Sequence, residues 1–168
     1  MLQLLANLGR SSGYWLAIIF IGLCMEGVAL FYQYGLDYGP CVLCIHVRIW
    51  VMAFILLAIL ALLIRHNRAL LIGAHLLNTI AAVGLFERSW LTFAVERNLI
   101  EGSCTMSTGL PDWFALDQWF PAIFEAWELC GWTPELLFGI TMAEGLLVMS
   151  AGAIIATALV LIATFIKR

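Results

Sequence analysis

Cysteines are the residues in this sequence best suited to chemistry. Cys41 and Cys44 form a C-x-x-C motif, whereas Cys104 and Cys130 stand far apart further along the chain. Four cysteines allow three pairings, and the close spacing favours a bond within the motif, which leaves the other two for each other. A very short disulfide ring removes little entropy from the unfolded chain, and strained or exposed small rings tend to be labile and catalytic. The motif therefore predicts a redox-active pair, whereas the longer ring suits a structural disulfide better.

Two features beside Cys44 favour its thiolate form. The residue lies at or near the first turn of an expected helix, where unpaired backbone N–H groups and the helix dipole stabilise an anion. Arg48 follows four positions later and therefore lies over the same helix face. A guanidinium at that place stabilises an anion and donates hydrogen bonds, so we predict a functional role for Arg48.

Zinc is the rival chemistry for these cysteines. A structural zinc site needs four nitrogen or sulfur ligands, commonly from two C-x-x-C pairs. Cys104 and Cys130 do not form such a pair, and no histidine stands near them. His46 lies in the helical turn after Cys44, where it is badly placed to complete a site with the motif. We therefore predict no metal site, and a metal-binding or structural protein remains the alternative class.

The composition excludes a soluble protein. Hydrophobic types make up 64% of the chain and charged types 11%, against about 45–50% and about 25% in an average soluble domain. Too little polar surface is available to cover a water-soluble enzyme, and a disordered protein is excluded for the same reason. A net charge of −3 gives no basic surface for nucleic acid. We predict one small domain embedded in a lipid bilayer.

Four segments are long and apolar enough to cross about 30 Å of hydrocarbon. They cover residues 14–31, 45–64, 69–86 and 146–166. Open backbone cannot face lipid, so the spans must be helices, and we predict an all-α four-helix bundle. The loops at the end that carries the cysteines then cover residues 32–44 and 87–145.

Basic residues predict the orientation of these spans, because cytoplasmic loops are enriched in lysine and arginine. The side that holds both termini carries five of them, whereas the opposite side carries Arg88 and Arg97 in its loops. The five are Arg10, Arg65, Arg68, Lys167 and Arg168. Both termini are therefore expected in the cytoplasm, and the two cysteine pairs face an extracytoplasmic space, which is oxidising in bacteria.

This topology places the C-x-x-C motif at the outer edge of the lipid, where a hydrophobic electron acceptor can arrive sideways. The alternative for Arg48 at that depth is an ordinary interfacial anchor whose guanidinium reaches the headgroups. Cys24 falls inside the first span, and we interpret it as a small buried hydrophobic residue.

The long outer loop and the spans hold further polar and aromatic patterns. Residues 111–127 alternate aromatic and acidic types, which predicts one or two short amphipathic helices in the membrane interface. Glu26 in the first span is either a functional group or a protonated, hydrogen-bonded side chain. His75 and Asn78 share a helix face and predict a hydrogen bond between helices.

Taken together, these motifs resemble the disulfide bond formation protein B (DsbB) family. The resemblance rests on the run Pro-Cys-Val-Leu-Cys-Ile from residue 40, on Arg48, and on the loop sequence over residues 111–119. It includes the outer loop with its own cysteine pair and covers nearly the whole chain. The resemblance implies a thiol oxidase of the bacterial inner membrane.

The order of electron transfer is implied by the same resemblance. A reduced periplasmic oxidase of the DsbA type attacks the Cys104–Cys130 disulfide and forms a mixed disulfide through Cys104. Electrons then pass to the Cys41–Cys44 pair, with Cys130 meeting Cys41.

The final electron acceptor implied by the resemblance is a quinone from the membrane pool, either ubiquinone or menaquinone. Cys44 hands over the electrons, with the quinone held near Arg48, and by analogy with the family Met142, at the outer start of the fourth span, is expected near the quinone. An enzyme similar to vitamin K epoxide reductase, or a paralogue that serves one dedicated oxidase, is the redox alternative.

The chain departs from the family pattern at two places. Many members carry Tyr-Glu-Arg where this sequence has His46, Val47 and Arg48, so the acid beside the arginine is absent. The histidine found in members near the outer end of the third span has no counterpart, because the aligned residue is Leu91. The acid therefore has no role in tuning this site, where His46 is the candidate to replace part of it, and proton delivery to the quinone is not assigned to a histidine at the third span.

Overall fold

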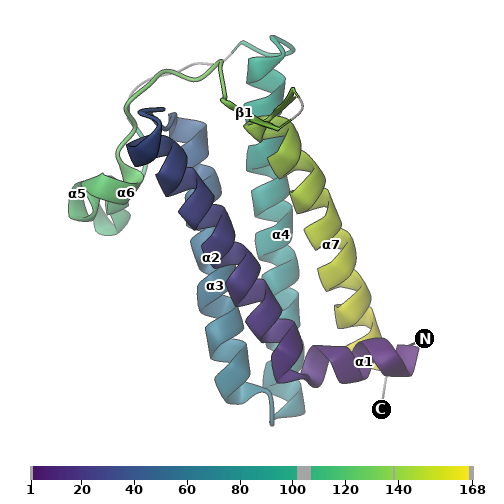
Figure 1. The fold of residues 1–168 in the computed structure, drawn as a ribbon. Coiled ribbons are helices and arrows are strands. Elements are labelled where there is room, and N and C mark those ends of the chain that lie inside the picture. The colour runs from purple at the N-terminus through teal and green to yellow at the C-terminus, as the bar shows by residue number, and fades with distance from the viewer. Residues whose placement is uncertain (1, 102–106, 138, 167–168) are drawn as a thin grey trace.

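Helices dominate the computed structural model, which describes residues 2–101, 107–137 and 139–166. Four long helices form a bundle (Figure 1): α2 (Ser12–Gly35), α3 (Val42–Ile64), α4 (Arg68–Glu96) and α7 (Met142–Ile166). Each is long and apolar enough to cross a membrane. The predicted all-α membrane protein with four spanning helices is thereby confirmed.

The bundle has two unlike ends. The start of α2 and the end of α7 lie together at one end, which we call the terminal end, and the start of α3 lies at the other, which we call the cysteine end (Figure 1). Only a three-residue turn, residues 65–67, joins α3 to α4 at the terminal end. The cysteine end carries the long connection from α4 to α7, and most of the irregular chain is therefore there.

Polar side chains fix the first turns of the long helices. Ser11 Oγ accepts the Tyr14 N–H at 3.2 Å at the start of α2. Asn67 Oδ1 accepts two backbone N–H groups of the first turn of α4, at 3.0 and 3.4 Å. These caps satisfy backbone donors that have no partner inside the helix.

Helix α4 continues well beyond the predicted end of the third span at residue 86. Glu87 and Arg88 end the apolar run, but the helix extends to Glu96. Ser89, Thr92 and Val95 continue its buried face at helical spacing. Hydropathy marks where a helix leaves the lipid, and the periodic face marks how far the helix itself runs.

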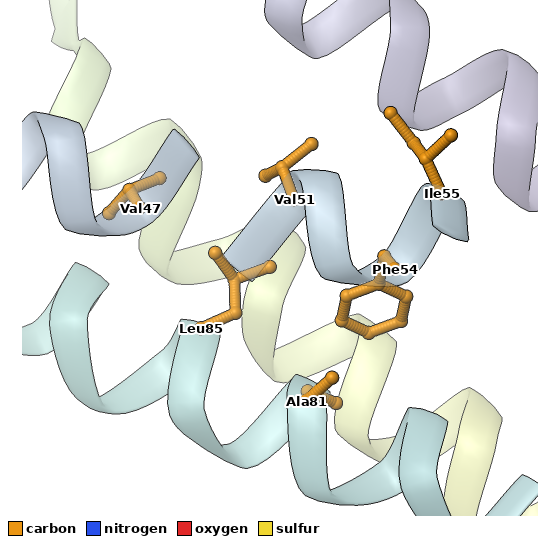
Figure 2. Packing of buried hydrophobic residues seen from close by; sticks show 7 residues of the cluster. Val47, Val51, Phe54, Ile55, Ala81 and Leu85 are labelled. Atoms are coloured by element: carbon orange, nitrogen blue, oxygen red, sulfur yellow. The ribbon is translucent and has the colours of Figure 1, made fainter. Parts of the chain in front are cut away.

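The bundle core lies between α3 and α4. Val47, Val51, Phe54 and Ile55 of α3 form one buried cluster with Ala81, Ala82 and Leu85 of α4, in which Ile55 points toward α2 (Figure 2). Small residues on α4 let the two backbones approach, as is common where helices pack inside a membrane. Helix α4 also packs along α7, and α2 packs on α3. The bundle is therefore built around α3 and α4.

A short helix that the sequence analysis did not predict closes the terminal end. Helix α1 (Leu2–Arg10) runs across the bundle and packs against α7 (Figure 1). Its buried residues are Ala6 and Gly9, and the Trp15 indole N–H donates to the Gly9 carbonyl at 3.0 Å. A single residue, Ser11, separates this helix from α2.

The connection from α4 to α7 contains short elements only. A 3-10 turn (η1, Asp112–Phe114) precedes α5 (Leu116–Trp119) and α6 (Pro121–Phe124). The short helices thus occur where the aromatic pattern predicts them, and they lie to one side of the bundle (Figure 1). A small antiparallel hairpin of β1 (Glu135–Leu137) and β2 (Ile140–Thr141), which the sequence analysis did not predict, leads into α7.

Candidate thiol redox site

Three of the predicted redox cysteines meet at the cysteine end. Cys41 stands just before α3, is 4% exposed, and its sulfur accepts the Cys44 N–H at 3.3 Å. The Cys41 thiol is also within hydrogen-bonding distance of the sulfurs of Cys130 and Cys44. These hydrogen bonds, together with burial, raise the pKa of the Cys41 thiol above its ordinary value. Cys41 is thus the central member of the group.

Main-chain pairing brings the Cys130 segment to this place. The Trp127 N–H donates to the Pro40 carbonyl at 2.9 Å, and Cys41 pairs with Glu128 in an isolated parallel bridge. A Cβ atom at Gly39 would lie 2.8 Å from Glu128 Cγ and 2.9 Å from Trp127 Cβ. The close approach of the two chain segments therefore requires glycine at this position.

Cys104, the fourth predicted cysteine, lies outside the described residues, so its pairing with Cys130 stays a prediction. The chain after it is fixed from Thr108 onward. The Thr108 carbonyl oxygen lies 2.8 Å from His46 Nε2. The Thr108 hydroxyl donates a hydrogen bond to Asp117 at 2.7 Å. His46, for which the sequence offered no clear role, therefore links the first turn of α3 to the outer loop.

Arg48 is buried rather than directed at solvent. Its side chain is held by three acceptors and is 5% exposed overall. Nη1 donates to Gln33 Oε1 and to the Ile123 carbonyl, each at 2.7 Å, and Nη2 donates to the Ala29 carbonyl at 3.2 Å. An anchor for headgroups would extend outward, so that alternative does not describe this side chain. Arg48 instead ties α2 and α6 to α3.

A cavity of about 380 Å³ lies beside Cys44 and Arg48. Its walls come from α2, α3 and α7, with Thr92 of α4, and residues 133–136 close one side. The lining is almost wholly apolar, and Met142 at the start of α7 contributes to it. The volume falls within the range of about 300–1,000 Å³ that is usual for small-molecule sites.

Glu26 on α2 also lines this cavity. Its side chain is 8% exposed, and its Oε1 atom has no hydrogen-bond partner among the described residues. The described residues therefore do not supply this oxygen with the hydrogen bond that the interpretation of a protonated, bonded carboxyl requires. Glu26 and Arg48 line the same cavity.

Two interpretations of residues inside the spans are wrong. Cys24 is exposed on α2 and not buried, because α2 presents much of its surface outside the bundle. Asn78 donates to the Ala74 carbonyl of its own helix at 3.3 Å, and its Oδ1 atom has no partner, so among the described residues no bond from Asn78 to a neighbouring helix is present. His75 stacks on Trp15 of α2, with ring centroids 4.8 Å apart, and neither ring nitrogen has a hydrogen-bond partner among the described residues.

Comparison with known proteins identifies the family. The family model described as "Disulfide bond formation protein DsbB" matches residues 11–161, which is most of the chain. The chain belongs to the DsbB family. Cys41, Cys44, Arg48 and Cys130 all lie within the matched region.

Curated DsbB proteins resemble the chain over nearly its full length. Disulfide bond formation protein B of Photobacterium profundum is 30% identical and covers 99% of this chain and 96% of its own length. The protein of the same name from Haemophilus influenzae strain 86-028NP is 32% identical, with 99% and 95% covered. Disulfide bond formation protein B 2 of Pseudomonas aeruginosa is 33% identical over 77% of this chain and 78% of its own. The similarity to these DsbB relatives supports the conclusion that this chain is a membrane protein of disulfide bond formation, with the role of a disulfide oxidoreductase.

The DsbB assignment also bears on the metal question. Within residues 2–101, 107–137 and 139–166, no group of three histidine, cysteine or acidic side chains is arranged to hold a metal ion. Cys41, Cys44 and Cys130 instead lie with their sulfur atoms close to one another, as thiol–disulfide exchange requires.

Proposed function

We propose that this protein reoxidises a DsbA-type dithiol oxidase and passes the electrons through two cysteine pairs to a membrane quinone. The observation that carries the proposal is the position of Cys41. Its thiol is within hydrogen-bonding distance of Cys130 on one side and Cys44 on the other. Cys44 in turn lines the apolar cavity. A continuous path therefore leads from the outer loop to a space next to the lipid.

The electron path is a sequence of two thiol–disulfide exchanges. A thiolate of the reduced oxidase attacks Cys104 of the Cys104–Cys130 disulfide, and the oxidase's second thiol then releases Cys104 as its own disulfide forms. Cys130, now reduced, attacks Cys41 of the Cys41–Cys44 disulfide, and Cys44 leaves as a thiolate. Cys104 then attacks Cys130, which restores the outer disulfide and leaves Cys41 and Cys44 reduced.

A bound quinone supplies the oxidising chemistry, because it accepts two electrons and two protons as the inner pair returns to a disulfide. DsbA-type oxidases are strong oxidants, so their reoxidation needs an acceptor of at least comparable potential. Ubiquinone and menaquinone are both flat, apolar molecules with two carbonyl oxygens. An apolar cavity with one cationic donor group suits either of them.

Three residues of the chain are expected to hold the quinone. Arg48 uses three hydrogen bonds to position its guanidinium, which carries five N–H groups, so donors remain for a carbonyl oxygen. Cys44 presents its sulfur from the wall of the same cavity, and Met142 contributes an apolar, polarisable surface. Because α2 and α7 both line the cavity, we expect the quinone to enter from the lipid between them.

The proposal includes the placement in the cell. We propose a bacterial inner membrane protein with both termini in the cytoplasm and the redox cysteines on the periplasmic side. The start of α2 and the end of α7 lie at one end of the bundle, and the start of α3, which follows Cys41, lies at the other, as this requires (Figure 1).

The test is an assay of the purified protein with a reduced DsbA-type oxidase and added ubiquinone or menaquinone, in which thiols and quinol are measured together. Cys44→Ser is expected to abolish quinol formation. Leu43→Ala, a change at the adjacent residue of the same helical turn, is expected to retain it. Continued quinol formation by the Cys44→Ser protein would exclude the proposed path.

A second variant separates the two halves of the path. Cys104→Ser is expected to block electron transfer from the oxidase, because it removes the sulfur that the oxidase attacks. The same variant should still reduce quinone when a small dithiol such as dithiothreitol reduces the inner pair directly. Loss of both activities would show that Cys104 is needed for the fold rather than for the exchange.

A further inference from the structure

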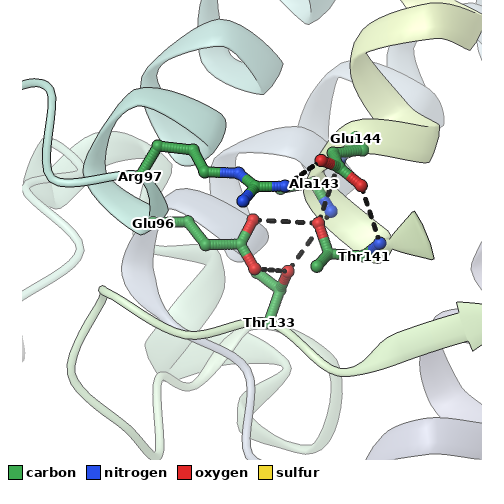
Figure 3. A network of polar contacts seen from close by, with 6 residues as sticks. All are labelled: Glu96, Arg97, Thr133, Thr141, Ala143 and Glu144. Carbon is green, nitrogen blue, oxygen red and sulfur yellow. Dashed lines mark hydrogen bonds and ion pairs between the residues drawn. The ribbon is translucent and has the colours of Figure 1, made fainter. Parts of the chain in front are cut away.

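Polar side chains at the cysteine end of α4 form a network with the start of α7 (Figure 3). The Glu96 carboxylate accepts a hydrogen bond from the Thr133 hydroxyl at 2.9 Å and another from the Thr141 hydroxyl at 3.0 Å. Each bond uses a different carboxylate oxygen. One helix end therefore holds two separate points of the chain that follows Cys130.

Thr133 is fixed from two sides. Besides donating to Glu96, its hydroxyl oxygen accepts the Ala143 N–H at 3.3 Å. That N–H belongs to the first turn of α7, where backbone donors lack partners inside the helix. The side chain of Thr133 is buried, and its hydroxyl both donates and accepts. Helices α4 and α7 together determine where this residue lies.

The start of α7 has a cap of its own. Glu144 Oε2 accepts the Thr141 N–H at 3.1 Å, and Thr141 Oγ1 accepts the Glu144 N–H at 3.3 Å, which is the reciprocal pattern of a capping box. Arg97 forms an ion pair with Glu144. The bond between Glu96 and Thr133 is therefore an addition to this cap rather than the cap itself.

Gly131 and Trp132, the two residues between Cys130 and Thr133, are both exposed. Gly131 adopts a φ of +130°, a conformation that side chains other than hydrogen rarely allow. Trp132 is 56% exposed, and its ring packs against that of Tyr38, with the ring centroids 5.3 Å apart. The attachments at either end of this turn therefore help to determine the position of Cys130.

We propose that Glu96 is a positioning residue that, through Thr133, holds the Cys130 thiol against Cys41. The main-chain bond to Pro40 attaches the segment upstream of Cys130, and Glu96 attaches it downstream. This inference rests on the proposed electron path, in which Cys130 exchanges with Cys41. A displacement of about 1 Å in a reacting group can cost on the order of a hundredfold in rate, so loss of one attachment should slow the exchange.

The test measures how readily Cys130 and Cys41 bond to each other. With Cys24, Cys44 and Cys104 replaced by serine, these are the remaining two of the five cysteines. Diamide then takes two electrons and two protons from the two thiols, and one S–S bond forms, which is followed by mass spectrometry. Glu96→Ala and Thr133→Val are each expected to slow this bond formation by on the order of tenfold.

Matched variants separate positioning from general stability. Thr133→Ser keeps the hydroxyl and should form the Cys41–Cys130 bond as fast as the protein with Thr133. Glu101→Ala removes a nearby exposed acid outside the network and should leave the rate of bond formation unchanged. Thr141→Val removes the other bond to Glu96 and part of the α7 cap, so it should lower the unfolding temperature with a much smaller effect on the rate. Equal slowing by Thr141→Val and Thr133→Val would assign the network a structural role only and overturn the proposal.

The test stands apart from the proposed function, because it uses neither quinone nor a protein oxidase. An unchanged rate of bond formation in folded Glu96→Ala and Thr133→Val proteins would overturn the positioning role, even if quinol formation proceeds as proposed. With native cysteines, Glu96→Ala should slow quinol formation driven by the oxidase and spare that driven by dithiothreitol. Equal slowing with both reductants would also count against the proposal.

Discussion

The two ends of the bundle treat buried polar side chains differently. At the cysteine end, Arg48 donates to three acceptors and Glu96 accepts from two hydroxyl groups. In the terminal half, both ring nitrogens of His75, the side-chain oxygen of Asn78 and the hydroxyl of Tyr14 are buried without a hydrogen-bond partner among the described residues. Glu26 Oε1 and His46 Nδ1, nearer the cysteines, are also buried without a partner among the described residues. The contrast therefore concerns the side chains that attach the irregular chain to the bundle, Arg48 and Glu96, which are hydrogen-bonded.

The difference follows from the kind of chain that is attached at each end of the bundle. The cysteine end contains short helices and a hairpin whose backbone N–H and C=O groups need hydrogen-bond partners. Hydrogen bonds from side chains pair these groups and also fix the orientation of the segments. The terminal end joins regular helices by short turns, and α1 fits there through a glycine placed against α7. Substitutions at the cysteine end should therefore change electron transfer, and those at the terminal end should change stability.

The largest effect is expected from Arg48→Ala. The substitution removes three hydrogen bonds and leaves buried acceptors unpaired, which should cost about 3 kcal/mol in unfolding free energy. Quinol formation should fall on the order of a hundredfold, as when a single donor at a reacting oxygen is removed. Steady-state quinol kinetics and thermal unfolding check the two effects. Unchanged quinone kinetics would restrict Arg48 to holding α2 and α6.

Gly9→Ala should act on stability alone. The added Cβ would lie 2.6 Å from Val160 Cγ1 and 2.9 Å from His75 Nε2, so α1 has to move. Overpacking of this kind costs about 1–3 kcal/mol. Thermal unfolding should show the loss, whereas quinol formation at low temperature should persist. Gly73→Ala on α4, where the Cβ meets open space, is the matched control and should not destabilise.

Trp15→Phe is expected to have a smaller effect at the same end. The change removes the hydrogen bond from the indole N–H to the Gly9 carbonyl and keeps an aromatic ring against His75. A single bond of this type contributes about 1 kcal/mol. The unfolding temperature should fall modestly, and a fall as large as that of Gly9→Ala would mean that ring volume rather than the bond holds α1.

The smallest effect is expected from His75→Phe. Because neither ring nitrogen has a partner among the described residues, replacing the imidazole with an apolar ring of similar shape should be nearly neutral or stabilising. Unfolding and quinol formation are both measured. A large loss of quinol formation would mean that the terminal half takes part in electron or proton transfer, and the contrast between the two ends would fail.

The sequence predicts the parts of this protein that depend on composition and local spacing. Four apolar runs correspond to four long helices, and the position of Arg48 four residues after Cys44 places both in the wall of one cavity. Cys24 was misjudged because hydropathy does not distinguish a residue buried in protein from one facing lipid. The spacing of buried positions to Val95 was a readable sign of the longer α4.

The remaining features depend on contacts between distant parts of the chain. The acceptors of Arg48 include two backbone carbonyls, which every residue possesses, so no residue type marks them. Glu96 and Thr133 meet only after the outer loop has folded back on α4. The Thr141–Glu144 capping box was readable as a T-x-x-E pattern, but its neighbour Glu96 was not.

The joint between Pro40 and Trp127 has a consequence for how the sequence can vary. Its bonds are made by main-chain groups, so the side chains of Trp127 and Glu128 do not specify it. Substitution of either side chain should be tolerated as long as the new side chain does not crowd the backbone at residues 39–41. The restriction falls on Gly39, where any Cβ would collide with both neighbours. Position 39 is therefore restricted to glycine, whereas residues 127 and 128 of the facing loop can vary.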